Sequence, residues 1–360
     1  MKTLTASILF GAMLAGPAFA QNAPALQNAA PEERARLEKL IEGAKQEGAL
    51  SYLDTVLQPS TNDDLVAAFR KHYGLPSSFK VNYALTTTGN LVTRVEQEIG
   101  ADRVTTDVVA IASPTWVFEQ VAAHNVMEYA SPEYKNYSKV FEQGFGQDGY
   151  FAFNGAYVFV PMWNAEKLDF KGKSIKDVIG AVAAGRISIG DVGKSTAYLA
   201  TFVGQRDVAD EKFFRDLAAM KPSFLIRSEQ IAARLVTGED LMAFSGMPTR
   251  AFQYNQKGAK LKFLLPEEGV VLLPQNLFIL AKAPHPSSAR LWLDFILSEQ
   301  GQTTLAKDEA LISGRSGFTS PLPDYAPAID DLKLIKVDWK ATSSAKLKEL
   351  RDAWVATFNP

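Results

Sequence analysis

The sequence predicts an α/β protein with mostly parallel sheets flanked by helices, because short strands and helices alternate along it. Apolar runs such as 107–112 are followed by stretches with apolar residues at helical spacing, such as 114–123. Strands that are apolar nearly throughout are typical of a parallel sheet covered on both faces. The chain has 360 residues, more than one hydrophobic core normally serves, so we expect two lobes.

Helices and strands alternate regularly through the first half of the chain. A first helix with apolar residues at helical spacing is expected to end at Gly48. Strands are predicted at 49–53, 79–85 and 107–112, and helices at 63–73, 90–99 and 114–123. The helix over 63–73 is expected to begin after the capping candidates Thr61 and Asn62.

The same alternation continues in the second half. Strands are predicted at 157–160, 187–190, 241–244 and 270–273, and helices at 287–297 and 345–358. The last of these helices is amphipathic, with Leu347, Leu350 and Trp354 on one face. It is expected to close the fold by packing that face against the protein.

The N-terminus has the features of an export signal. Lys2 gives a positive start, residues 8–16 form an apolar stretch, and Ala18 and Ala20 offer the small residues of a cleavage site. The apolar stretch is shorter than the roughly 20 residues that a membrane-spanning helix needs. We therefore expect cleavage after Ala20, a loose leader over 21–31 and a periplasmic location.

Composition argues against several classes of function. With 38 basic and 40 acidic residues the net charge is -2, which gives no electrostatic footprint for nucleic acid or an anionic membrane surface. The absence of cysteine removes disulfides, thiol catalysis, thiolate metal sites and a cysteine-linked lipid anchor. His72, His124 and His285 lie in separate segments, and the sequence has no Gly-x-Ser-x-Gly elbow. We predict that the protein is not an enzyme and holds no metal or cofactor.

Polar loops follow the predicted strands, and this is where ligands bind in an open α/β sheet. Such loops occur at 54–55, at 86–90, at Ser113 with Thr115, at 193–196 and at 245–250. The residues predicted to bind a ligand are Asp54, Thr55, Thr87, Thr88, Gly89, Ser113, Tyr157, Ser195, Thr196, Ala197 and Arg250.

The charge of the predicted site comes from Arg250. A guanidinium can hold a carboxylate or a phosphonate through two parallel hydrogen bonds. The alternative is a surface arginine paired with Glu239 or Asp240. Ser195 and Thr196 stand at a predicted helix start, where backbone N–H groups and hydroxyls can receive an anion or where the side chains simply cap the helix.

The remaining candidates each have a structural alternative. The hydroxyls of 86–90 can face a ligand or cap the following helix, and Asp54 can accept from a ligand or form a turn. Tyr157 can stack on a ligand or belong to the core. The segment 193–196 also resembles the end of a P-loop, but Ser188 stands where that motif needs glycine.

Five segments together resemble one family, the periplasmic solute-binding proteins of ABC importers that include ferric-ion, thiamine, polyamine and phosphonate binders. They are 40–48, 106–109, 163–168, 189–197 and 289–302. The resemblance covers nearly the whole chain after the signal. It implies two α/β lobes joined by crossing strands that close over a small-molecule ligand, and a permease in the inner membrane as partner. We also expect a monomer.

The resemblance gives approximate lobe boundaries. The first lobe is expected over 32–130 and 271–312, and the second over 160–270. Residues 131–159 form the crossover, and 313–360 are expected to pack across the second lobe.

The chain departs from the iron-binding members of that family. Those members hold the metal with two adjacent tyrosines, a histidine and an acidic residue. The matching loop here, 245–250, has no tyrosine, no two of the eleven tyrosines are adjacent, and Ser113 stands at the acidic position. The anion-binding turn of the family is retained at 195–197.

We therefore predict the substrate-binding component of an ABC importer that captures a small organic anion, a carboxylate or a phosphoryl-type group. Three alternatives stay open. They are a ferric iron or iron-chelate binder of the same family, a secreted hydrolase or transferase, and a periplasmic partner of a chemoreceptor.

Overall fold

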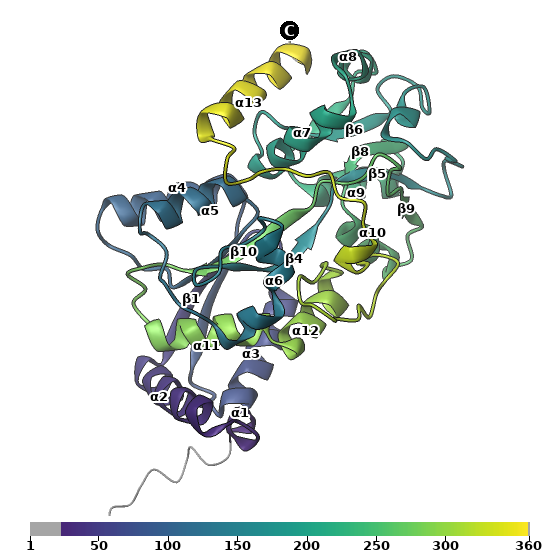
Figure 1. The fold of residues 1–360 in the computed structure, drawn as a ribbon. Helices are drawn as coiled ribbons and strands as arrows, with labels where there is room; N and C mark the ends of the chain where they lie inside the picture. Colours follow the sequence, from purple (N-terminus) through teal and green to yellow (C-terminus); the bar gives the residue numbers. More distant parts are fainter. Residues whose placement is uncertain (1–22, 359–360) are drawn as a thin grey trace, which may run out of the picture.

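The computed structural model describes residues 23–358 and shows two sheets, each flanked by helices (Figure 1). This confirms the predicted fold class. The predicted export signal, with its cleavage after Ala20, lies outside the described residues. The loose leader expected over 21–31 differs from the structure, because Pro24–Gln27 form the short helix α1. Leu26 is buried there and α1 packs against α2 and α3, so this apolar side chain anchors the segment.

The sheet of the first lobe has five strands in the order β2-β1-β3-β10-β4. Their bounds are Ala49–Asp54 (β1), Lys80–Leu85 (β2), Val108–Ile111 (β3), Ala152–Tyr157 (β4) and Leu273–Ile279 (β10). Strand β1 pairs in parallel with β2 and β3, whereas β10 runs antiparallel to both β3 and β4. Only β10 therefore runs against the common strand direction.

The sheet of the second lobe repeats this plan in the order β7-β6-β8-β5-β9. Its strands are Val160–Asn164 (β5), Ile187–Gly190 (β6), Ser223–Leu225 (β7), Met242–Gly246 (β8) and Leu261–Phe263 (β9). Strand β6 is parallel to β7 and β8, and β5 is antiparallel to β8 and β9. The carboxyl ends of most strands in each lobe thus lie at one edge of the sheet.

The chain crosses between the two sheets at 158–159 and again at 264–272. The strands predicted at 157–160 and 270–273 fall largely on these crossings, so both predictions are wrong in position. Val158 and Leu272 are nearly fully buried where they pass between the lobes. Their apolar character therefore reports burial and not strand pairing.

Helices cover both sheets. In the first lobe they are α2 (Pro31–Glu47), α3 (Pro59–Tyr73), α4 (Thr88–Gly100), α5 (Pro114–Ala122), α6 (Ser138–Glu142), α11 (Pro286–Leu297) and α12 (Glu299–Glu309). In the second lobe they are α7 (Thr196–Val208), α8 (Glu211–Ala219), α9 (Ser228–Thr237) and α10 (Pro248–Asn255). Helix α3 starts four residues before the predicted start, because Pro59 occupies its first turn and the expected caps Thr61 and Asn62 are buried inside it.

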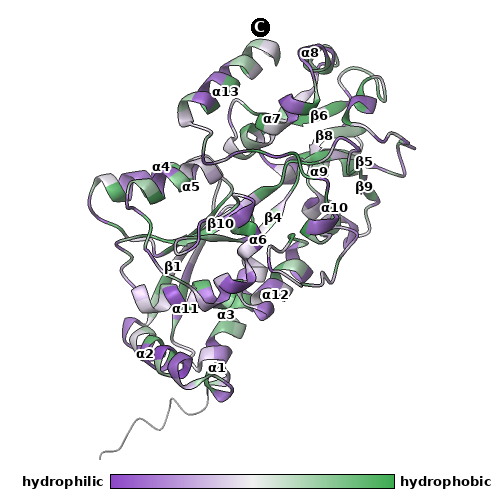
Figure 2. Cartoon of the chain, in the orientation of Figure 1, coloured by the Kyte–Doolittle hydropathy of each residue, from purple (hydrophilic) through white to green (hydrophobic). Residues whose placement is uncertain are grey.

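The core lies between sheets and helices. The hydrophobic colour follows the strands, whereas hydrophilic residues lie on outer helices such as α2 (Figure 2). At the C-terminus, α13 (Ser344–Phe358) packs on α7 and α8, and Trp354 meets Phe224 with ring centroids 5.3 Å apart. Residues 313–343 also contact the first lobe, where the hydroxyl of Thr115 donates to the carbonyl oxygen of Trp339 at 3.1 Å.

Candidate functional site

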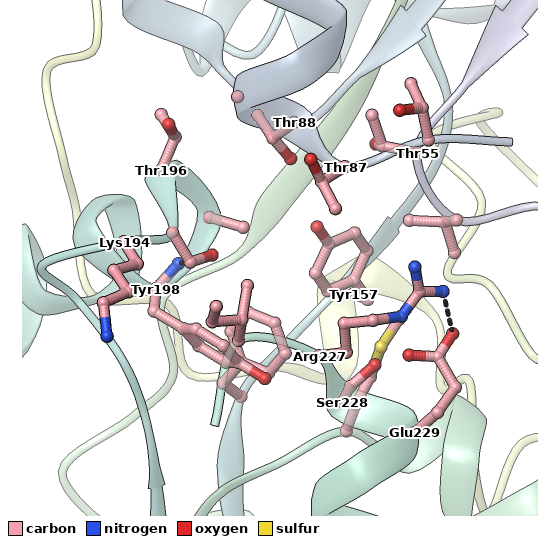
Figure 3. Close-up of a pocket in the computed structure, with 18 of the residues that line it drawn as sticks. Thr55, Thr87, Thr88, Tyr157, Lys194, Thr196, Tyr198, Arg227, Ser228 and Glu229 are labelled. Carbon is pink, nitrogen blue, oxygen red and sulfur yellow. Dashed lines mark hydrogen bonds and ion pairs between the residues drawn. The ribbon is translucent and has the colours of Figure 1, made fainter. Parts of the chain in front are cut away.

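A polar cleft opens between the two lobes at the carboxyl ends of the strands. It contains about 600 Å³ of space free of protein atoms, including the part that is open to solvent. From the first lobe it is lined by Thr55 after β1 and by 86–89 between β2 and α4. Tyr157, at the end of β4, lies where the chain begins to cross, and its hydroxyl points toward Thr87 and Thr88 (Figure 3).

The second lobe lines the cleft with three loops, each of which leads into a helix. They are 194–198 before and within α7, 226–229 at the start of α9, and Met247 with Arg250 at the start of α10. Ser195 is the N-cap of α7, and its hydroxyl accepts from the N–H of Tyr198 at 3.5 Å. The structure thus brings both sides of the predicted site together.

Four helices begin at the cleft, namely α4, α7, α9 and α10. The first N–H groups of a helix have no partner within it, and the helix dipole places a partial positive charge at that end. Thr87 caps α4 with a 3.4 Å bond, whereas α9 and α10 have no capping bond from a Ser, Thr, Asp or Asn side chain. Four converging N-termini make the cleft favourable for an anion.

Arg250 is the buried cation of the cleft, since only 3% of its side chain is exposed. Its Nε donates to the hydroxyl of Ser228 at 3.1 Å, and its Nη1 donates to the side-chain oxygen of Gln253 at 2.7 Å. Its Nη2 forms an ion pair with Glu229 Oε1 at 2.8 Å. These partners use three of the five guanidinium N–H groups, and one N–H on each Nη has no partner among them.

The alternative interpretation of Arg250 as a surface residue paired with Glu239 or Asp240 is wrong. Both of those carboxylates pair with Arg234 instead, and Asp240 lies 2.6 Å from its Nε. That ion pair sits in the turn after α9, away from the residues that line the cleft. Arg250 therefore pairs with neither carboxylate and lines the cleft.

Positive charge exceeds negative charge in the lining. Lys194, Arg227 and Arg250 are cationic, and Glu229 is the one carboxylate among the lining residues described. Burial raises the pKa of Glu229, but Arg250 and Arg227 outweigh this effect and hold its pKa below the usual value. Glu229 is thus ionised at neutral pH, and it neutralises only part of the positive charge.

Two aromatic hydroxyls face the same region. Burial raises the pKa of Tyr157 and of Tyr198 well above the ordinary value, so both are neutral phenols. The hydroxyl of Tyr198 is buried and has no hydrogen-bond partner among residues 23–358. An unpartnered buried hydroxyl at a cleft is suited to meet a ligand atom or an ordered water.

Two of the predicted ligand-binding residues do not line the cleft. Asp54 is fully buried, and its carboxylate accepts the backbone N–H groups of Val56 and Leu57 at 2.7 and 2.9 Å. It also accepts the side-chain N–H of Gln275 at 2.9 Å, so it stabilises the turn after β1. Ser113 is buried at the N-cap position of α5.

The loop 227–229 was missed by the sequence analysis although it supplies three lining residues. It follows β7, which has only three residues and is too short to give a clear period-two pattern. The available signal was the helix that follows, where Ser228 and Glu229 precede the buried Ile231, Ala232 and Leu235. A serine and an acidic residue before such a run indicate a helix start.

A family profile described as bacterial extracellular solute-binding protein matches residues 64–330. The match covers well over half of the chain, so the chain belongs to this family and the predicted resemblance is confirmed. The family binds small solutes for ABC transporters and does so outside the cytoplasm. Comparison with curated proteins gave no match.

Solved periplasmic binding proteins have the same fold. AfuA of Actinobacillus pleuropneumoniae, with bound fructose-6-phosphate, matches with a TM-score of 0.73 and 19% identity over 86% of this chain and 98% of its own. Iron-bound HitA of Pseudomonas aeruginosa matches with a TM-score of 0.68 and 19% identity, over 85% of this chain and 99% of its own. The periplasmic binding protein P5PA matches with a TM-score of 0.70 and 20% identity, over 87% of this chain and 100% of its own. At such identities the similarity establishes the fold alone.

Two further features of the described residues bear on class. No helix within 23–358 combines the length and apolar character needed to cross a membrane. In the same part of the chain, no three His, Cys, Asp or Glu side chains are grouped so that they could hold a metal ion.

Proposed function

We propose that this protein is the periplasmic, substrate-binding component of an ABC importer and that it captures a small organic anion in the cleft between its lobes. The anion carries a carboxylate or a phosphoryl-type group. The observation that carries the proposal is the position of buried Arg250 among four helix N-termini.

Each lobe contributes a different part of the proposed binding site. Arg250 and the helix start at Ser195–Ala197 receive the charged group from the second lobe. Thr87 and Thr88 lie on the opposite wall, in the first lobe (Figure 3), and we assign their hydroxyls as donors to the ligand. A charged ligand between these walls holds the lobes together. The closed lobes then form the surface that the permease recognises.

The ion pair with Glu229 is compatible with an anionic ligand. Arg227 lies 3.4 Å from the same Glu229 oxygen as an additional cation, so two guanidinium groups share one carboxylate. The nearly neutral chain has little long-range field, and the anion is therefore attracted by these local groups and by the helix dipoles. The described lining residues include no histidine, and their one carboxylate, Glu229, pairs with two arginines; we therefore propose binding without catalysis.

The ligand is identified by native mass spectrometry of protein purified from its export compartment without refolding. We expect a bound small molecule whose fragmentation yields a carboxylate or a phosphoryl group. A bound molecule that is a cation or a neutral compound, or bound ferric iron, would contradict the proposal. The same experiment reports the mass of the chain and thereby tests export and cleavage after Ala20.

A further inference from the structure

A second carboxylate lies behind the cleft, at the end of α12 in the first lobe. Glu309 is fully buried and has no cation in direct contact among the residues described. Its Oε1 accepts the backbone N–H of Gln58 and the hydroxyl of Thr61, each at 2.7 Å. Both donors belong to the start of α3 in the same lobe. A buried carboxylate is costly unless its oxygens are well satisfied, so this arrangement requires a reason.

The other oxygen of Glu309 reaches across to the second lobe. Its Oε2 accepts from Nε2 of Gln253 at 2.8 Å. Gln253 lies on α10, which packs on α9 and β9 of the second lobe, whereas α12 packs on α3 and β4 of the first. This hydrogen bond therefore joins the two lobes.

The same Gln253 side chain holds the cation of the cleft. Its oxygen accepts from Nη1 of Arg250 at 2.7 Å. Arginine only donates and an ionised glutamate only accepts, so the amide satisfies both neighbours in one orientation. An uninterrupted chain of hydrogen bonds thus runs from α3 through Glu309 and Gln253 to Arg250.

We propose that Glu309 is a positioning residue for Arg250 that acts from the opposite lobe through Gln253. The inference rests on the proposed anion site. Rotation of the lobes apart about the crossings at 158–159 and 264–272 separates α10 from α12, because the two helices belong to different lobes. Gln253 then loses its bond to Glu309, so the amide that accepts from Arg250 Nη1 is no longer fixed from the first lobe. Its orientation toward Arg250 is restored when the lobes close. Anion binding and closure are coupled by this chain.

A double-mutant cycle on the anion affinity tests the coupling. The probes are inorganic phosphate and succinate, titrated by calorimetry into the mature protein at pH 7.5. Three donors bond to Glu309, namely the Gln58 N–H, the Thr61 hydroxyl and Gln253 Nε2, and in Glu309→Gln one of them faces an amide N–H instead of an oxygen. Gln253→Leu removes the connecting amide with a side chain of similar size. Each variant is expected to weaken binding of the better probe by roughly tenfold. The double variant is expected to bind the probe no more weakly than the weaker-binding single variant, because both changes break the same chain of hydrogen bonds.

Thr249→Ala is the matched control. The Thr249 hydroxyl donates to the carbonyl oxygen of Ala310 at 3.4 Å, so it forms an interlobe hydrogen bond and is not one of the partners of the Arg250 side chain. This variant is expected to bind the probe within about twofold of the parent. A loss as large as that of Gln253→Leu would show that any interlobe bond has this effect, and would overturn the proposal.

The outcomes separate the two proposals. If the parent binds neither probe at millimolar concentration, the anion site itself is wrong and the positioning role falls with it. If the parent binds but Gln253→Leu and Glu309→Gln bind equally well, the positioning role alone is wrong. Circular dichroism and thermal unfolding identify a variant that fails to fold, and the remaining single variant then decides by its affinity.

Discussion

Arg250 has an unusual position for an arginine, because it is buried and yet the one carboxylate that pairs with it, Glu229, also pairs with Arg227. Ser228, Gln253 and Glu229 each hold a different nitrogen of the guanidinium. A side chain fixed in this way loses little conformational freedom when it receives an anion. This preorganisation is the basis for assigning it the charged group of the ligand.

Replacing Arg250 is therefore expected to harm binding more than replacing any hydroxyl. Arg250→Ala should weaken binding of the ligand by about 2 to 5 kcal/mol, since it removes one partner of a charge-assisted pair in a desolvated site. Ser195→Ala removes a neutral group and should weaken binding by about 1 kcal/mol. Calorimetric titration of both variants measures the difference. If Arg250→Ala binds as tightly as the parent while it folds normally, the anion site is wrong.

Iron is not expected to be the cargo. Tyr157 and Tyr198 are in the cleft, but burial raises the pKa of both, so the phenolate form that ferric iron needs is disfavoured. Addition of ferric citrate to the mature protein should produce no intense visible absorption from tyrosinate bound to iron. A strong band that is lost in Tyr157→Phe or Tyr198→Phe would contradict this prediction.

The candidate site was predictable at the residue level where a polar loop follows a clear strand. Thr87, Thr88 and Ser195 were found in this way, and they line the cleft. Asp54 obeys the same rule but turns inward, because two backbone N–H groups in its own turn are closer partners than a ligand. Sequence alone does not tell which of these two acceptor roles an aspartate takes.

At the scale of elements, helix ends were predicted better than helix starts. Gly48 and Gly74 end α2 and α3 in the left-handed conformation that glycine adopts easily. The start of α3 was misplaced because polar residues near a helix start are not always caps. Thr61 lies inside the helix and donates to buried Glu309, a partner 248 positions away that no local pattern can reveal.

The contact between α2 and α11 predicts a dependence of stability on pH. Asp294 on α11 pairs with Arg36 on α2 at 2.9 Å and accepts from the hydroxyl of Ser131. Burial raises the pKa of Asp294 to about 6 despite these partners. The folded state therefore binds a proton more tightly than the unfolded state, and the resulting stabilisation at low pH is lost as the pH rises from about 4 to about 6.

Asp294→Asn should remove this component, because the amide does not titrate. The free energy of unfolding is measured with urea at pH 4.5 and at pH 7. The decrease between these two pH values should be about 2 kcal/mol smaller in the variant than in the parent. Asp330→Asn, at an exposed ion pair with Lys139, is the control and should follow the parent. Equal pH dependence of the parent and Asp294→Asn would show that Asp294 does not titrate in this range.

At the scale of the whole molecule, the structure has two similar lobes joined by the chain crossings at 158–159 and 264–272 and by the segment 313–343 that leads to α13 (Figure 1). The two lobes and their sheets were predictable from alternation and length, since each strand is apolar over its own few residues. The identity of the ligand was not predictable, because the cleft is built from loops that lie far apart in the sequence. Side chains from 55 to 250 meet there only after both lobes have folded.

Closure should accompany ligand binding. The radius of gyration of the mature protein, measured by small-angle X-ray scattering, is expected to decrease when its ligand is added, since both lobes contact the bound anion. Arg250→Ala should show no decrease at the same ligand concentration. A radius that is unchanged at saturation of the parent would contradict the clamp mechanism.

The most direct test of an anion held between the lobes is a crystal structure of the protein with the ligand that it carries from its export compartment. We expect the charged group of the ligand within hydrogen-bond distance of the Arg250 guanidinium and of the backbone N–H groups at Thr196 and Ala197, with Thr87 or Thr88 contacting it from the first lobe. A ligand that places an uncharged or cationic group against Arg250, or that binds outside the cleft, would contradict the account.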